Sequence, residues 1–97
     1  MEANQLMLTG VVAELETLRY TPAGVPLVGC LIRHESQQIE AGNPRRVSLE
    51  LAAVAIGDLA QHSALSLGSH ISVEGFLARK SQKSNHIVLH ICSVKPV

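Results

Sequence analysis

The chain has 97 residues, of which 46% are apolar and 16% are charged, and its eight basic side chains balance eight acidic ones. This length accommodates one domain, residues 1–97, and the apolar content is too high for a wholly disordered protein. The first ten residues lack the basic region and apolar core of a secretory signal, and the longest apolar run, residues 51–56, is too short to cross a bilayer. We therefore expect a cytoplasmic protein.

Alternation of apolar and polar residues predicts that the chain begins with two β-strands. The first is expected at residues 4–13, where Gly10 favours a bend or a close approach of another backbone. Residues 20–24 read YTPAG, and their proline and glycine predict a turn. The second strand is expected at 25–34, with an inward face formed by Val28, Cys30 and Ile32.

The middle of the chain predicts a polar loop, a third strand and one helix. Residues 35–44 are polar and contain glycine, asparagine and proline, which favours a long hairpin loop without regular structure. A short helix is expected within 55–65, with Asp58 as its amino-terminal cap. The third strand, at 45–53, should turn inward its apolar residues Val47, Leu49 and Leu51.

Residues 69–92 predict two further strands joined by a basic loop. Apolar residues or glycine occupy every second position from Ile71 to Leu77 and from Ile87 to Ile91. No acidic residue follows Glu74, so residues 77–97 carry four basic groups alone, whereas residues 1–76 carry eight acidic and four basic groups. Such asymmetry favours an anionic partner.

Five strands, a glycine within the first strand and a helix after the third describe an all-β protein, the five-stranded Greek-key barrel of the OB-fold. Periodicity alone leaves a small β-sandwich or an SH3-like barrel as alternatives. A chain this short buries only about 60–65% of its unfolded surface, so self-association would add stability. We expect a homodimer whose interface uses the apolar first strand, through Leu6, Met7, Leu8 and Val11.

The residue types give little support for a metal site or a catalytic centre, and we expect no cofactor. His86 and His90 lie four residues apart in a strand-like run, which separates them by roughly 13 Å, too far for one ion. The polar residues of 58–63 would not form a nucleophile and its base on a helix. Two cysteines, Cys30 and Cys92, are too few for a disulfide framework and are expected to be buried free thiols.

Basic side chains gather where the second and third strands and two loops of an OB barrel border one groove. Such groups favour contact with the backbone of a single-stranded nucleic acid. The aromatic residues are only Tyr20 and Phe76, and the place of Phe76 on the polar side of its strand favours a protein interface over base stacking. The candidate DNA-binding residues are Arg19, Tyr20, Arg33, His34, Arg45, Arg46, Arg79, Lys80 and Lys83.

Several segments resemble the single-stranded DNA-binding protein superfamily: NQLMLTGVV at 4–12, LRYTPAG at 18–24 and LGSHISVEGFL at 67–77. HESQQIEAG at 34–42 and HIVLH at 86–90 resemble one branch more closely, the primosomal replication protein N or PriB family. The resemblance covers nearly the whole chain. It implies an OB-fold homodimer that is not an enzyme, binds single-stranded DNA and acts in the primosome during replication restart. It also implies the helicase PriA and, in some bacteria, the loader DnaT as partners.

Position by position, Arg19 falls where the family has a basic residue before its turn, and Lys80 and Lys83 match its basic loop. The final residues, 95–97, differ from the acidic-aromatic tip of general single-strand binding proteins, which favours the PriB branch. Ser48 stands where the family has a tryptophan, and the basic loop is about two residues shorter. These departures predict weak, electrostatic DNA binding. They leave as alternatives a general single-stranded DNA-binding protein and a helicase adaptor.

Overall fold

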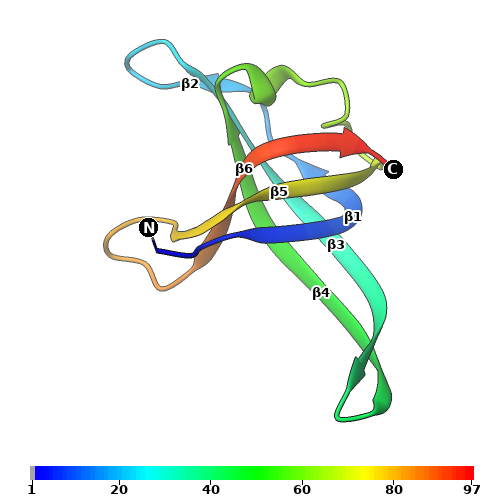
Figure 1. Cartoon of the computed structure of the whole chain (residues 1–97). Coiled ribbons are helices and arrows are strands. Elements are labelled where there is room, and N and C mark those ends of the chain that lie inside the picture. The colour runs from blue at the N-terminus through cyan, green and yellow to red at the C-terminus, as the bar shows by residue number, and fades with distance from the viewer. Residues whose placement is uncertain (1) are drawn as a thin grey trace.

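The computed structural model describes residues 2–97 and shows strands that close into a barrel (Figure 1). Around the ring the order is β1-β5-β6-β4-β3, and β1 closes it by pairing with β3 as well. The short β2 adds only two residue pairs to the start of β3. This is the five-stranded OB barrel that the sequence predicts. The strands are β1 (Leu6–Leu15), β2 (Arg19–Tyr20), β3 (Pro26–Glu40), β4 (Asn43–Ile56), β5 (His70–Arg79) and β6 (Ile87–Pro96).

The first strand, β1, serves two neighbours because it bends near its middle. Residues 6–11 pair with β5, and residues 11–15 pair with β3. At the bend, a Cβ atom on Gly10 would lie 2.5 Å from the carbonyl oxygen of Arg33, so glycine is needed for this approach. The bend predicted from Gly10 is therefore confirmed. It leaves the edge of residues 6–10 that faces away from β5 without a β-partner in the described part of the chain.

The core is filled by every second residue of the barrel strands, as the alternation predicts. The fully buried side chains are Val12, Ile32, Ile71, Val73 and Leu89, and Cys30 is buried beside them. Each such burial stabilises the fold by about 1.5–3 kcal/mol. The prediction for Cys92 is wrong, since its thiol is exposed. Alternation explains this, because Cys92 shares the outward face of β6 with His90.

The segment expected to be an irregular polar loop, residues 35–44, forms a β-ribbon instead. β3 and β4 pair without interruption as far as Glu40 opposite Asn43, and only Ala41 and Gly42 make the turn. Both have positive φ angles, 52° and 79°, as in the tight type I′ turns of hairpins. The ribbon projects from the barrel (Figure 1), and polar residues suit its two solvated faces. Two ion pairs also cross it, Glu40–Arg45 at 2.9 Å and Glu35–Arg46 at 3.5 Å.

The helix expected within residues 55–65 is reduced to one 3-10 turn, Gly57–Gln61. Gly57 has a φ of 81°, which ends β4 and begins the turn, and the Asp58 side chain does not cap it. This turn is the only helical element of residues 2–97, and no helix there is long enough to span a membrane. Leu49 was expected to face the core, but it is 39% exposed because it lies on the ribbon beyond the barrel.

Candidate nucleic-acid interface

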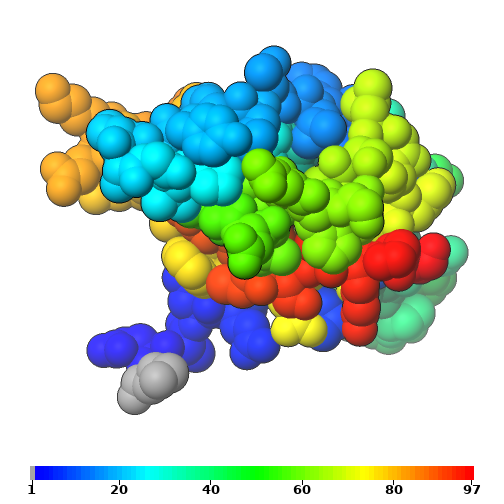
Figure 2. Space-filling model, turned by 90° about the horizontal axis from the view of Figure 1, so that it is seen from above, coloured from blue at the N-terminus to red at the C-terminus, as the bar shows by residue number. Residues whose placement is uncertain are grey.

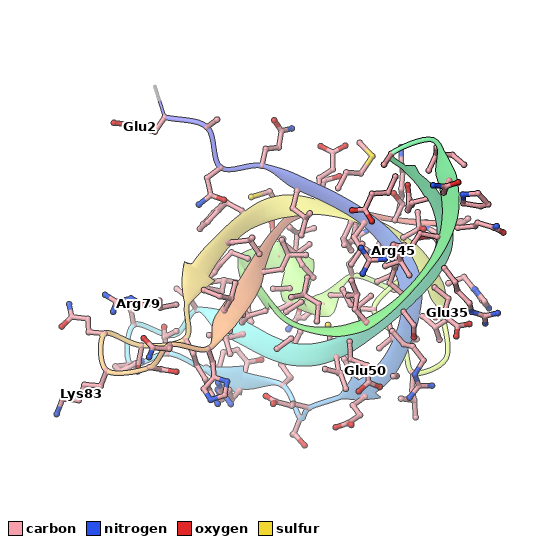
Figure 3. All side chains as sticks on the ribbon, turned by 90° about the horizontal axis from the view of Figure 1, so that it is seen from below. Glu2, Glu35, Arg45, Glu50, Arg79 and Lys83 are labelled. Carbon is pink, nitrogen blue, oxygen red and sulfur yellow. The ribbon has the colours of Figure 1, made fainter. Side chains whose placement is uncertain are left out.

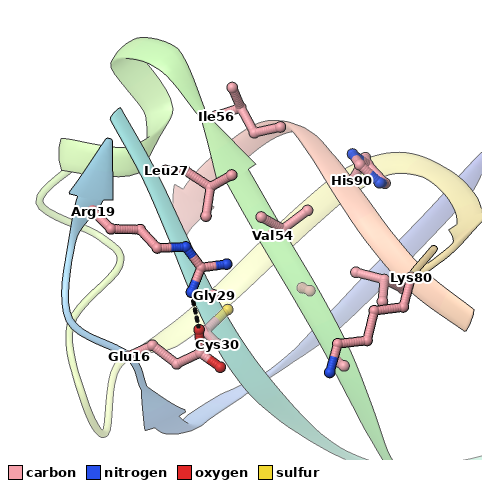
Figure 4. A pocket seen from close by; sticks show the side chains of 12 residues that line it. Glu16, Arg19, Leu27, Gly29, Cys30, Val54, Ile56, Lys80 and His90 are labelled. Carbon is pink, nitrogen blue, oxygen red and sulfur yellow. Dashed lines mark ion pairs between the residues drawn. The ribbon is translucent and has the colours of Figure 1, made fainter. Parts of the chain in front are cut away.

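An open groove of about 270 Å³ crosses the outer face of β3, β4 and β6 (Figure 4). Strand pairing places Gly29, Val54 and His90 side by side in one row across this face. Small and apolar residues such as Ala52 and Val88 form the rest of the floor between these strands. Two basic side chains, Arg19 and Lys80, also line the groove.

Arg19 is placed by β2 and by the turn that follows. In β2, Arg19 pairs with Leu27 at the start of β3, which fixes its backbone beside the groove. The turn is closed by the N–H of Gly24, which donates to the carbonyl of Thr21 at 2.8 Å, and Gly24 has a φ of 83°. The turn predicted at residues 20–24 is thus confirmed. Tyr20 lies next to Arg19 and is exposed.

Lys80 is placed by the loop between β5 and β6, residues 80–86. Its N–H donates to the carbonyl of His86 at 2.9 Å and closes the base of the loop. Arg79 ends β5, and Lys83 lies near the tip. In Figure 1 this loop, in orange, projects from the barrel well below the turn that follows β2. Figure 2 shows it in orange at one side of the molecule. Arg19 and Lys80 both line the groove and lie on opposite sides of it (Figure 4).

Ion pairing divides the predicted basic residues into two groups. Each arginine before residue 50 contacts a glutamate: Arg19–Glu16 at 3.6 Å, Arg33–Glu50 at 3.1 Å, Arg45–Glu40 at 2.9 Å and Arg46–Glu35 at 3.5 Å. Within residues 2–97, the four later cations have no acidic group within 4 Å: Arg79, Lys80, Lys83 and Lys95. Arg79, at the end of β5, and Lys83, on the basic loop, lie on the opposite side of the molecule from Arg45 (Figure 3). Three of these four cations therefore lie at the end of β5 and in the loop that follows it, and one of them, Lys80, lines the groove.

The remaining candidates lie along the ribbon or inside the protein. Arg33 and Arg46 share the outer face that continues from the groove floor, whereas Arg45 lies on the opposite face of the ribbon. His34 is only 8% exposed because it lies on the inward side of β3. Its Nδ1 donates to the carbonyl of Thr9 at 2.7 Å, and its Nε2 bonds the Ser36 hydroxyl at 2.7 Å. Both ring nitrogens are occupied, so we remove His34 from the candidate surface.

Among the charged and aromatic side chains that line the groove, the sequence did not predict Glu16 and His90. Glu16 follows β1, and its carboxylate lies over Gly29 next to Arg19. Burial, together with the charge of Glu16, raises the pKa of the Cys30 thiol to about 11. His90 is on the outward face of β6, where its alternation with Leu89 and Ile91 could have placed it. Glu16 had no such signal, because it lies outside the strands.

Comparison with known proteins shows the family to which the chain belongs. A family model described as another single-strand binding protein family matches residues 4–93. The replication restart protein PriB of Bordetella pertussis is 46% identical over 89 residues, which cover 91% of this chain and 83% of that protein. PriB of Neisseria meningitidis serogroup B is 36% identical over 92 residues, 95% of this chain and 92% of that one. This chain belongs to the PriB family of single-strand binding proteins.

Solved structures agree with membership of the PriB family. PriB from Ralstonia solanacearum superposes with a TM-score of 0.88 at 35% identity and covers 98% of both chains. The single-stranded DNA binding protein of Thermus aquaticus shares the fold, with a TM-score of 0.76 at 24% identity over 98% of this chain and 50% of that one. The resemblance to PriB seen in the sequence is confirmed. Ser48, which replaces the tryptophan expected in PriB, is exposed on the ribbon face that carries Arg33 and Arg46.

Proposed function

We propose that this chain binds single-stranded DNA in the groove and acts as a PriB protein in replication restart. The observation that carries the proposal is the cluster of cations without acidic partners among residues 2–97, Arg79, Lys80 and Lys83, of which Lys80 lines the groove. Ammonium and guanidinium groups that track a phosphate backbone release its counterions and so drive binding. The apolar floor beside them leaves room for the sugars and bases between the phosphates.

The same charge distribution makes the proposed binding weak and salt-dependent. Each arginine elsewhere on the candidate surface is already paired with a glutamate, so a phosphate must compete for it. The three unpaired cations of the loop would give a slope of log K against log salt of about −2, at about 0.7 per phosphate contact. The exposed Ser48 offers no ring on which a base could stack. We therefore expect phosphate contacts to supply most of the affinity.

Fluorescence anisotropy of a labelled oligothymidylate, titrated at several salt concentrations, tests this function. Lys80→Ala and Lys83→Ala should each reduce the salt slope by about 0.7. Lys95→Ala is the matched control, because Lys95 also lacks an acidic partner among residues 2–97 but pairs with Ser72 at the far end of β6. An unchanged slope in the double variant Lys80→Ala, Lys83→Ala would exclude the loop from the site.

We propose the helicase PriA as the main protein partner, with DnaT as a second partner where it occurs, since the PriB resemblance implies both. The paired arginines also favour a second candidate function, an adaptor whose main ligand is the helicase rather than DNA. Oligonucleotide binding at physiological salt, measured with and without PriA, separates the two functions. Nanomolar affinity for DNA alone would contradict the adaptor.

We also propose a homodimer formed through β1. An edge strand with unpaired backbone groups readily pairs with another strand, and residues 6–10 present such an edge. Pairing of this edge with its copy about a two-fold axis would be antiparallel and would join two barrels into one sheet. Met7 is 64% exposed in the single chain, and the predicted neighbours Leu6, Leu8 and Val11 are half-buried.

A further inference from the structure

Phe76 of β5 and His90 of β6 form a stacked pair on the outside of the barrel. The two residues lie directly opposite each other in the β5–β6 register. Their ring centroids are 5.0 Å apart, and their planes differ by only 4°. Parallel rings on neighbouring strands stand up from the sheet with their faces directed across the strands. Each ring therefore has one face inside the pair and one face outside it.

The two residues border different hollows. His90 lines the groove together with Arg19 and Lys80, and Phe76 does not. Phe76 lines a separate hollow beside the amino-terminal residues Asn4 and Gln5, and His90 does not. The pair is thus a wall between the two hollows, with the imidazole on the groove side. Figure 4 shows the His90 ring at the side of the groove, next to Val54.

We infer that His90 is a base-stacking residue of the groove and that Phe76 is the positioning residue behind it. This inference rests on the proposed function, and it replaces the sequence-based expectation that Phe76 belongs to a protein interface. An imidazole is among the rings on which single-stranded bases stack. Strand pairing places Val54 next to His90, and the carboxylate of Glu16 lies over Gly29, which is two strands away from the imidazole. Lys80 lies on the same groove and can hold the adjoining phosphate.

Phe76 contributes by fixing the orientation of the His90 imidazole before DNA binds. A side chain that is fixed before binding loses less rotamer freedom when the ligand arrives. Because the phenyl ring covers one face of His90, the imidazole has a preferred upright orientation, and only its groove face remains for a base. The stacked pair therefore supplies the aromatic platform that the serine at position 48 cannot supply, but on β5 and β6 rather than on the ribbon part of β4.

The chain contains no tryptophan, so His90→Trp introduces a single fluorescent indole at this wall. Oligothymidylate should quench its emission, because a base stacks on the ring. An oligonucleotide with abasic sugars in place of nucleotides, equal in length and charge, should bind without quenching. The matched control is His70→Trp, since His70 is exposed at the start of β5 and does not line the groove; its emission should not change.

Affinity gives the second readout. His90→Ala should weaken oligothymidylate binding about 5-fold, the lower end of what one stacked base contributes, and leave the salt slope unchanged. His90→Tyr should restore the affinity, and Phe76→Leu should cause a smaller loss than His90→Ala. If oligothymidylate binds His90→Trp without quenching it, or binds His90→Ala as it binds the parent protein, the inference is overturned while the proposed function stands. If the parent protein binds no oligonucleotide even at low salt, both are overturned.

Discussion

The carboxylate of Glu16 lies directly over the Cα of Gly29, on the floor of the groove. A Cβ atom at position 29 would collide with this carboxylate, so the glycine makes the room that the acid occupies. From there Glu16 contacts Arg19 at 3.6 Å. A negative charge in this place competes with any phosphate that approaches the guanidinium. Glu16 would thus compete with the phosphates of the proposed DNA ligand for contact with Arg19.

Removal of that competitor should strengthen DNA binding. With Glu16→Gln, Arg19 is free to contact a phosphate, so the affinity should rise and the salt slope should become steeper by up to about 0.7. Anisotropy titrations over a range of salt concentrations measure both quantities. Glu14→Gln is the control, because it removes the same charge from a nearby exposed residue that has no basic partner among residues 2–97. Equal effects of the two variants would show that the change in net charge, rather than the release of Arg19, strengthens binding.

The proposed dimer predicts that the mass in solution is twice the 10.4 kDa of one chain. Met7→Asp should shift sedimentation equilibrium toward a single chain, because it places a charge on the proposed interface. The exposed position of Met7 lets the barrel itself tolerate the change. Leu67→Asp is the matched control, at an equally exposed apolar residue of the connection before β5. A parent protein that sediments as one chain at micromolar concentration would rule the dimer out.

Cys30 should make the fold less stable at high pH. Its thiol has a pKa of about 11 in the folded protein and 9.0 as the ordinary value, so the folded chain keeps a proton that the unfolded chain loses. The free energy of unfolding is therefore undiminished below pH 9 and falls between pH 9 and 11, by about 1.4 kcal/mol per pH unit. Urea unfolding at pH 8, 9 and 10 measures this loss. Cys30→Ala should lack this part of the slope, and parallel curves for the two proteins would refute the assignment.

The two cysteines should also differ in reactivity. Cys92 is exposed and Cys30 is buried. A thiol reagent at pH 8 should therefore modify one cysteine of the folded protein quickly and the second only after denaturant is added, because the thiolate is the reactive species. Peptide mapping identifies the modified residue. Rapid labelling of Cys30 in the folded chain would show that the barrel opens readily around this residue.

The ribbon turn offers a test of stability. Ala41 has a φ of 52°, a left-handed conformation that costs a residue with a Cβ atom about 1 kcal/mol. Ala41→Asn creates the Asn-Gly pair that type I′ turns prefer and should slow amide hydrogen exchange in the ribbon, whereas Gly42→Ala should accelerate it. The amides of β5 and β6 are the internal control, because they lie outside the ribbon. Equal exchange in the two variants would mean that the turn does not limit ribbon opening.

The barrel was predictable because a closed core gives each strand an inward face, and that face appears in the sequence as apolar residues at every second position. The ribbon was not predictable for the converse reason. Beyond the barrel both faces of residues 35–46 are solvated, so the apolar alternation disappears although the backbone pairing continues. The turn signal was also weak, since Ala41 stands where asparagine or glycine is usual.

The candidate site was predictable only in part. The loop lysines could be identified because no acidic residue follows Glu74. The ion pairs of the arginines could not be identified from the sequence. Arg33 and Glu50, for example, are 17 residues apart and meet only through strand register. The same holds for His34, whose partner, the Thr9 carbonyl, is on another strand. Contacts made by register require the folded sheet.

The shortest strand pairing of the barrel lies beneath the groove. β4 and β6 meet over only two residue pairs, Ala53 with Leu89 and Val54 with His90, whereas β3 and β4 share fourteen pairs and β5 and β6 share nine. Val54 and His90 both line the groove, so DNA bound there as proposed would contact both β4 and β6. It would thereby hold the β3–β4 pair against the β5–β6 pair. By mass action such a ligand raises the free energy of opening. DNA binding and the pairing of β4 with β6 are then coupled, and these strands should separate least readily while DNA is bound.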